Sequence, residues 1–352
     1  MTKNERWIDS LKGVAIIGVL CSHIDSNGLN GIIQKVFYGG ARGVQIFFVI
    51  SAFLAFQSLK RHYEQSENTI WLWYKKKAIR LLPLYYLFLI YSLLMQIKVG
   101  IDKSFLFNWI AHTLFINVFS PQYINSLLGL EWYIADIILF FLIAPFLYKV
   151  INSAEKAILS WGISAIGIAV LNNVLLSLID LSNYNLVSYI SNFSFATQLP
   201  AILAGIVLFY CYDTLKDLKI KNKDSICVLL MVLSVDLFAS LIMGSRIIGF
   251  SSVSLYSLGV LGIIVAINNK KFSIIDNRMF AFLGKHSYGI YLFQFMFLEN
   301  INGISISVNK YILYGLKLLM VLGLSLVSTL VWEKVENLFK GINFTIHRRK
   351  EL

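Results

Sequence analysis

Apolar stretches of about 20 residues recur along the whole chain and restrict what it can fold into more than any other feature. A helix needs roughly 20 mostly apolar residues to cross a hydrocarbon core about 30 Å thick. Only 14% of the residues are charged, whereas a soluble domain carries about 25%. The stretches lie at residues 11–28, 43–59, 81–98, 130–149, 157–177, 194–212, 225–243, 250–268, 284–301 and 311–332. The sequence therefore predicts an all-α, polytopic membrane helix bundle with about ten transmembrane helices.

Short polar segments separate these stretches, and no internal repeat or Pro/Gly/Ser-rich linker divides the sequence. We therefore expect a single integral membrane domain over residues 1–340 and a basic cytoplasmic tail at 341–352. The first apolar run is not followed by an A-x-A-like cleavage site, which favours a retained first helix over a signal peptide. The three cysteines, Cys21, Cys211 and Cys227, are too dispersed to support a disulfide framework or a zinc site.

The net charge of +12 is distributed as expected for a membrane protein rather than for a nucleic-acid-binding protein. With the N-terminus inside, 24 of the 31 Lys and Arg residues fall on inner segments and six on outer ones, and Lys317 lies within the last span. This bias follows the positive-inside rule and predicts that both termini are cytoplasmic. A full span at 105–118 would move every later loop to the opposite side of the membrane and put the later basic clusters outside. We therefore expect an outer interfacial or re-entrant helix there. The expected environment is the lipid bilayer of the cytoplasmic membrane, with no nucleic-acid partner.

Three polar side chains are predicted to reach one depth in the bilayer. His23 lies about 16 Å above Lys12 by helical rise, Ser51 about 12 Å below the outer end of its span, and Gln294 about 15 Å above the inner end of its own. Polar groups at this depth are costly and need a reason. A neutral imidazole can accept a proton near neutral pH, which suits a general base that deprotonates a hydroxyl attacking a thioester. The alternative is a histidine that only hydrogen-bonds between helices.

Other ionisable residues have structural interpretations. Asp136 and Lys317 are predicted at similar depths, which favours an intramembrane ion pair over a functional role. Asp236 has no partner that the sequence identifies. The remaining histidines fall in loops or at span ends, where we expect solvated or capping residues; they are His62, His112, His286 and His347.

The segment 60–80 carries six basic residues beside Trp71, Trp73 and Tyr74. For most of them the positive-inside bias and an interfacial aromatic belt are a sufficient account. Arg80 lies one turn before Pro83 at the mouth of a predicted helix, where it could bind the phosphates of a nucleotide-bearing donor such as coenzyme A.

The chain resembles the acyltransferase-3 family of membrane O-acyltransferases in an ordered series of motifs. RWIDSLKGVAIIGVLCSH is similar to the family's first-helix signature, a basic residue and a later His, and GARGVQIFFVISAFL to its pattern G-V-D-x-F-F-x-x-S-G-F. Further similar segments follow in the family's order: KKKAIRLLPLYY, EWYIADIILFFLIAP, QLPAILAGIVLFY, LGKHSYGIYLFQ and VENLFKG. The resemblance extends over nearly the whole chain.

This resemblance implies transfer of an acyl group, usually acetyl, from acyl-coenzyme A to a hydroxyl of an envelope polysaccharide or glycolipid. No permanently bound cofactor is expected, and acetyl-coenzyme A is the expected donor substrate. The implied catalytic residues are His23, Lys12 and Ser51, and the implied donor-binding residues are Arg80, Lys77 and Lys76. The implied substrate-binding or supporting residues are Asp9, Arg42, Trp132, Asp136, Tyr288, Tyr291 and Gln294.

The sequence also departs from the family pattern. Lys12 replaces the usual Arg, and Gln45 and Ala52 replace the Asp and the Gly of the second-helix pattern. Gln294 replaces the His that often ends the ninth-helix motif, and Asp136 lies one residue before the usual Glu position.

The alternative function is a membrane exporter or flippase of a modified or lipid-linked saccharide. Such transporters tend to show inverted repeats and broken helices, and the sequence shows neither.

Overall fold

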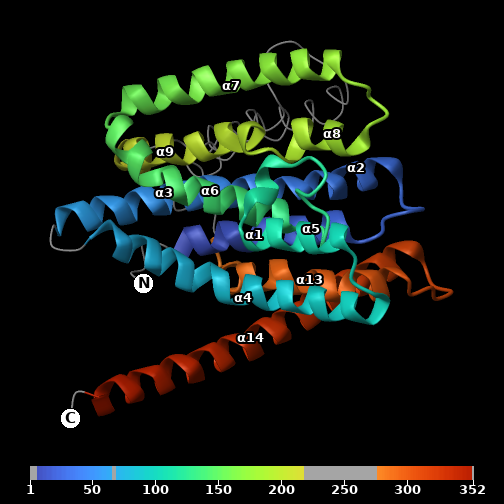
Figure 1. Cartoon of the computed structure of the whole chain (residues 1–352). Helices are drawn as coiled ribbons and strands as arrows, with labels where there is room; N and C mark the ends of the chain where they lie inside the picture. Colours follow the sequence, from blue (N-terminus) through green and yellow to red (C-terminus); the bar gives the residue numbers. More distant parts are fainter. Residues whose placement is uncertain (1–5, 66–68, 218–275, 351–352) are drawn as a thin grey trace. The chain divides into compact units, whose positions relative to one another are not determined.

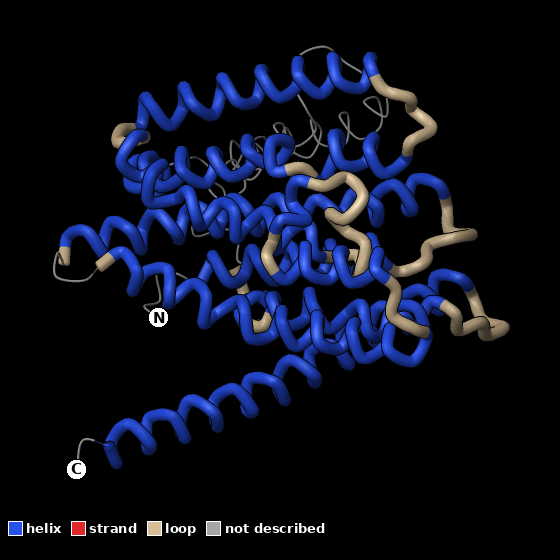
Figure 2. The backbone as a smooth tube through the Cα atoms, in the orientation of Figure 1, coloured by secondary structure: helices blue, strands red, loops and turns tan. Residues whose placement is uncertain are grey.

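The computed structural model describes residues 6–65, 69–217 and 276–350, which form helices joined by loops, with no strand among them (Figure 2). They fall into two compact units, residues 1–43 with 277–352, and residues 44–276. The predicted all-α class is therefore confirmed for the described part of the chain.

The first unit brings together both ends of the chain. Its elements, labelled in Figure 1 where space allows, are α1 (Arg6–His23), α2 (Gly31–Gly39), η1 (Gly40–Arg42), α12 (Arg278–Lys285), α13 (Ser287–Asn302) and α14 (Lys310–Lys350). α14 continues through most of the segment predicted as a tail. The division between a 1–340 domain and that tail stays a prediction.

The second unit holds the middle of the chain. Its elements are α3 (Gly43–Glu64, from its second residue onward), α4 (Ile70–Val99), α5 (Lys103–Thr113), η2 (Ile116–Phe119), α6 (Glu131–Val150), α7 (Ala154–Leu178), α8 (Tyr184–Ser188), the π-helical turn η3 (Tyr189–Phe193) and α9 (Phe195–Asp217). α5 has 11 residues and rises about 17 Å, which is too short to cross a bilayer as a straight helix.

Six helical segments in the described ranges are long and apolar enough to cross a membrane. They are Gly31–Glu64, Ile70–Lys98, Glu131–Val150, Ala154–Leu178, Tyr184–Asp213 and Lys310–Leu338. α1 and α13 are not among them, because α1 carries three charged side chains and α13 has only 16 residues. The predicted spans at 225–243 and 250–268, with Asp236 and Cys227, lie outside the described residues.

The end of the first helix differs from the predicted range of 11–28. α1 ends at His23, and the residues that follow form turns. The Asp25 side chain accepts a hydrogen bond from the amide of Asn27 at 2.9 Å, and Gly28 has a φ of 83°, a conformation that side chains with a Cβ rarely adopt. These local interactions compete with helix continuation. His23 is therefore the last residue of its helix rather than a residue in its middle.

Glycines allow the helices of the first unit to approach backbone to backbone. A Cβ added to Gly284 of α12 would lie 1.7 Å from the carbonyl oxygen of Asp9 in α1, and one added to Gly13 would lie 2.0 Å from that of Phe280. Small residues at such crossings are typical of helix packing in membranes. The second unit has a similar contact, because a Cβ at Gly205 of α9 would lie 2.2 Å from the carbonyl oxygen of Val49 in α3.

The close approach of α1 and α12 predicts that Gly284→Ala destabilises the protein. The added methyl group meets backbone that cannot move aside, and overpacking of this kind costs about 1–3 kcal/mol. Thermal unfolding of the detergent-purified protein should show an apparent Tm several degrees below that of the parent. Gly315→Ala in α14 is the matched control, because no heavy atom lies within 4 Å of its added Cβ. Equal Tm values for the two variants would contradict the close approach.

Candidate active site

His23 lies at the C-terminal end of α1 and contacts α13. Its Nδ1 is 3.3 Å from Oε1 of Gln294, and its ring meets that of Phe295 edge-on with centroids 5.0 Å apart. Helix counting predicted that His23 and Gln294 reach one level, and the structure brings these two side chains together. The imidazole is half-buried rather than enclosed.

The contacts of Gln294 determine which imidazole nitrogen carries the proton. Nε2 of Gln294 donates to the carbonyl oxygen of Tyr291 at 3.0 Å, so its Oε1 faces His23. Because an amide oxygen only accepts hydrogen bonds, Nδ1 of His23 must donate, which leaves the lone pair on Nε2. The pair thus sets the tautomer in which Nε2 can accept a proton. Gln294 itself is fully buried, which holds this geometry in place.

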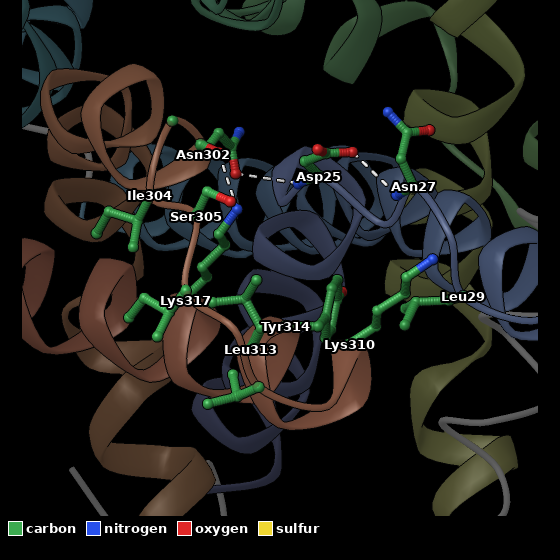
Figure 3. A pocket seen from close by; sticks show the side chains of 13 residues that line it. Asp25, Asn27, Leu29, Asn302, Ile304, Ser305, Lys310, Leu313, Tyr314 and Lys317 are labelled. Atoms are coloured by element: carbon green, nitrogen blue, oxygen red, sulfur yellow. Dashed lines mark hydrogen bonds between the residues drawn. The ribbon is translucent and has the colours of Figure 1, made fainter.

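Asn302 joins the end of α1 to the end of α13. Its side-chain amide donates to the carbonyl oxygen of His23 at 3.1 Å, and its side-chain oxygen accepts from the amide of Asp25 at 3.0 Å. The backbone carbonyl of Asn302 accepts from the ammonium of Lys317 at 2.8 Å (Figure 3). One residue therefore anchors the main chain directly after the side chain of the catalytic candidate. In the sequence, Asn302 is one residue of the short polar segment after the apolar stretch at 284–301, and its position there does not indicate these contacts.

A cavity of about 360 Å³ begins two residues beyond His23 (Figure 3). It is lined by the turn after α1, the segment between α13 and α14, and the first two turns of α14. The lining residues are Asp25, Asn27, Leu29, Asn302, Gly303, Ile304, Ser305, Ile306, Val308, Lys310, Leu313, Tyr314 and Lys317. The cavity lies entirely within the first unit.

The structure does not bring Lys12 to His23. The Lys12 ammonium lies 3.2 Å from the carboxylate of Asp9, one turn earlier on the same helix, and by helical rise Lys12 is about 16 Å from His23. Tyr291 is buried, whereas Arg42 and Tyr288 are half-buried. Among the predicted residues in this unit, Gln294 contacts His23 directly, and the Tyr291 carbonyl orients the amide of Gln294.

The second unit gathers the predicted donor-binding residues and Ser51. The Ser51 hydroxyl hydrogen-bonds with that of Tyr133, and the Arg80 charge is close enough to act on the same phenol. The ammonium of Lys77 lies 5.1 Å from the ring centroids of both Trp73 and Phe141. Arg80 and Lys76 are exposed. This group thus combines exposed cations with two hydroxyl groups.

Two further residues of α6 pack inside the second unit. Trp132 lies against Phe48 and Phe193, with ring centroids 6.1 and 5.2 Å away. Asp136 is fully buried, and both its carboxylate oxygens lack a hydrogen-bond partner among the described residues. The predicted pair of Asp136 and Lys317 joins residues of different units and stays a prediction.

The expectation of a solvated or capping histidine is wrong for His112, whereas His286 is a capping residue, as expected, although it is buried. His112 is fully buried, its Nδ1 lies 2.9 Å from the carbonyl oxygen of Asn108, and burial lowers its pKa below the ordinary value. His286 is 5% exposed, and its Nδ1 is 2.8 Å from the carboxylate of Glu333. Tertiary packing covers both rings. The position of a histidine along one predicted helix does not reveal such packing.

Comparison with known proteins supports the resemblance seen in the motifs. The chain is 24% identical over 321 residues to proteins named "Putative O-acetyltransferase" from Staphylococcus aureus strains COL, MSSA476 and MRSA252. The matches cover 82% of this chain and 50% of each relative, so the chain spans about half the length of these curated relatives. No solved structure matches. The family model described as an acyltransferase domain matches residues 5–332. The chain therefore belongs to the acyltransferase-3 family.

Proposed function

We propose that this protein is a multi-pass O-acyltransferase of the cytoplasmic membrane. It moves an acyl group, with acetyl as the expected group, from acyl-coenzyme A to a hydroxyl of an envelope polysaccharide or glycolipid. Family membership supports the reaction class. The observation that carries the mechanism is the hydrogen bond between His23 and Gln294, because it leaves Nε2 of His23 free to accept a proton.

In the proposed step, His23 is the general base. The acceptor hydroxyl gives its proton to Nε2 as its oxygen forms a bond to the thioester carbonyl carbon. The tetrahedral intermediate then collapses, the carbon–sulfur bond breaks, and the leaving thiolate takes the proton back from the imidazolium. The products are the acyl ester and free coenzyme A, and the imidazole returns to its starting tautomer.

The donor is proposed to bind through the basic residues at the start of α4. Coenzyme A carries several phosphate charges, and Arg80 can hold a phosphate through two parallel hydrogen bonds. Lys76 and Lys77 add positive charge within one turn of it, and the rings of Trp73 and Phe141 flank the Lys77 ammonium. Ser51 and Tyr133 provide hydroxyl donors close to this charge.

The proposed topology has ten spans with both termini in the cytoplasm. It puts the basic segment 60–80 on the cytoplasmic side, where acyl-coenzyme A is made, and the end of α1 toward the outer side. The positive-inside bias supports this orientation, and the six candidate spans of the described residues are consistent with a multi-pass chain.

Replacing His23 should abolish acyl transfer without unfolding the protein. Loss of a general base lowers rates by about 10²–10⁴-fold. His23→Ala and His23→Gln are therefore expected to reduce O-acetylation of the host's envelope glycan by such a factor, measured by mass spectrometry of the glycan. His62→Ala, at the end of α3, is the matched control and should retain acylation. Normal glycan acylation in a well-expressed His23→Ala strain would remove this residue from the mechanism.

Replacing Arg80 should weaken donor binding more than it slows chemistry. For Arg80→Ala, loss of a charge-assisted contact is expected to raise KM for acetyl-coenzyme A about tenfold or more, with a smaller change in kcat. Lys75→Ala is the control, since Lys75 is an exposed cation on the same helix. The measurement is coenzyme A release by the purified protein in the presence of acceptor. If the purified parent neither binds nor turns over acetyl-coenzyme A, the exporter or flippase becomes the better account.

A further inference from the structure

We propose that the cavity beyond His23 binds the acidic group of an anionic carbohydrate acceptor, a carboxylate or phosphate carried on the saccharide. This inference rests on the proposed function for the carbohydrate and on the cavity's own charges for the anion. The cavity volume of about 360 Å³ lies within the range of small-molecule sites.

Lys317 is the strongest sign of an anionic ligand. It is 6% exposed, and its ammonium donates a hydrogen bond to the carbonyl oxygen of Asn302 at 2.8 Å. No carboxylate lies within ion-pair distance of it among the described residues. An ammonium has three donors and a full charge, and burial without a counter-charge is unfavourable. The cavity that it lines is where a ligand oxyanion can complete its coordination (Figure 3).

Lys310 adds a second cation on the same face of the same helix. It lies seven residues, or two turns, before Lys317, so both side chains project toward the cavity. Its ammonium is held against Gly28, where an added Cβ would lie 2.6 Å from Nζ. Lys310 is also the first residue of α14, and the N-terminus of a long helix favours a nearby anion.

The remaining polar residues suit the hydroxyl groups of a sugar. Asp25 contributes one carboxylate to a lining that also holds the two ammonium groups, so the lining keeps a net positive charge. A carboxylate can accept hydrogen bonds from sugar hydroxyls, and Asn27 and Ser305 can both donate and accept. Leu313 and Tyr314 provide apolar surface for the C–H face of a sugar ring.

The position of the cavity connects it to the proposed base. The Asn302 side chain donates a hydrogen bond to the carbonyl of His23 and accepts one from the amide of Asp25. Its backbone carbonyl accepts a hydrogen bond from the Lys317 ammonium. A saccharide whose acidic group contacts Lys317 would therefore lie against the same residue that anchors the end of α1. The acidic group would orient the acceptor, and a hydroxyl elsewhere on the sugar would be the one acylated.

Binding to the purified full chain in phosphatidylcholine nanodiscs tests this proposal without the acyl donor. The probes are methyl β-glucuronide and glucose 1-phosphate, with methyl β-glucoside as their neutral counterpart. The acidic probes should bind about tenfold more tightly or better, as expected for a charge-assisted contact. Lys317→Met should remove that preference and Lys317→Arg should keep most of it. Lys334→Met, at an exposed position of α14, should leave it unchanged.

Two features of these variants separate a loss of probe binding from a loss of folding. Methionine is a similar-sized apolar replacement for a buried lysine, and it leaves no carboxylate unpaired among the described residues. Lys310→Ala removes an exposed cation, so its weaker binding of the acidic probes cannot arise from loss of the core. Both variants should keep the parent's apparent Tm.

Several results would overturn the proposal. Equal affinity for the acidic and neutral probes, or an unchanged preference in Lys317→Met, would exclude recognition of the acidic group. Inorganic phosphate binding as tightly as glucose 1-phosphate would show a simple anion site. Loss of probe binding in phosphatidylglycerol nanodiscs would assign the cavity to a lipid headgroup.

If the acidic probes bind in a Lys317-dependent way but acetyl-coenzyme A is never consumed, the inference is supported and the proposed function fails.

Discussion

The backbone of α1 packs directly against α12, and this close approach determines where His23 lies. Gly13 and Gly284 leave no room for a Cβ at the crossing. Because α13 begins two residues after α12 ends, fixing α12 also places Gln294 and Asn302 beside the end of α1. The imidazole tautomer, the anchored turn after α1 and the cavity beyond it all follow from that packing.

Much of the fold was predictable from sequence, because long apolar runs have few alternatives in a bilayer. Helices occur at every predicted span within the described residues, and α6 and α7 match within a few residues. The end of α1 was mispredicted because its apolar run continues past the last helical turn. Side-chain interactions of Asp25 and the backbone of Gly28 end the helix there, and hydropathy does not report either of them.

The candidate site was predictable only where helical geometry fixes it. Counting residues along three helices predicted that His23, Ser51 and Gln294 reach one depth, and the structure brings His23 and Gln294 into contact. Counting could not reveal Asn302, Asp25 or Lys310, because these residues lie in or beside turns whose shape depends on contacts between distant segments. Lys317 is a charge within a predicted span, but its depth alone does not identify the carbonyl of Asn302 to which it donates. The departure from the family pattern at Gln294 has a chemical meaning, since an amide can fix the tautomer of His23 as a neutral acceptor.

The hydrogen bond from His23 to Gln294 also joins residues that are 271 positions apart. During synthesis the imidazole emerges early, while its amide partner is added only after most of the membrane helices have been made. A nascent or truncated chain that lacks α13 therefore carries the histidine without the group that orients its proton. The proton-accepting tautomer proposed for His23 therefore depends on a helix that is synthesised late.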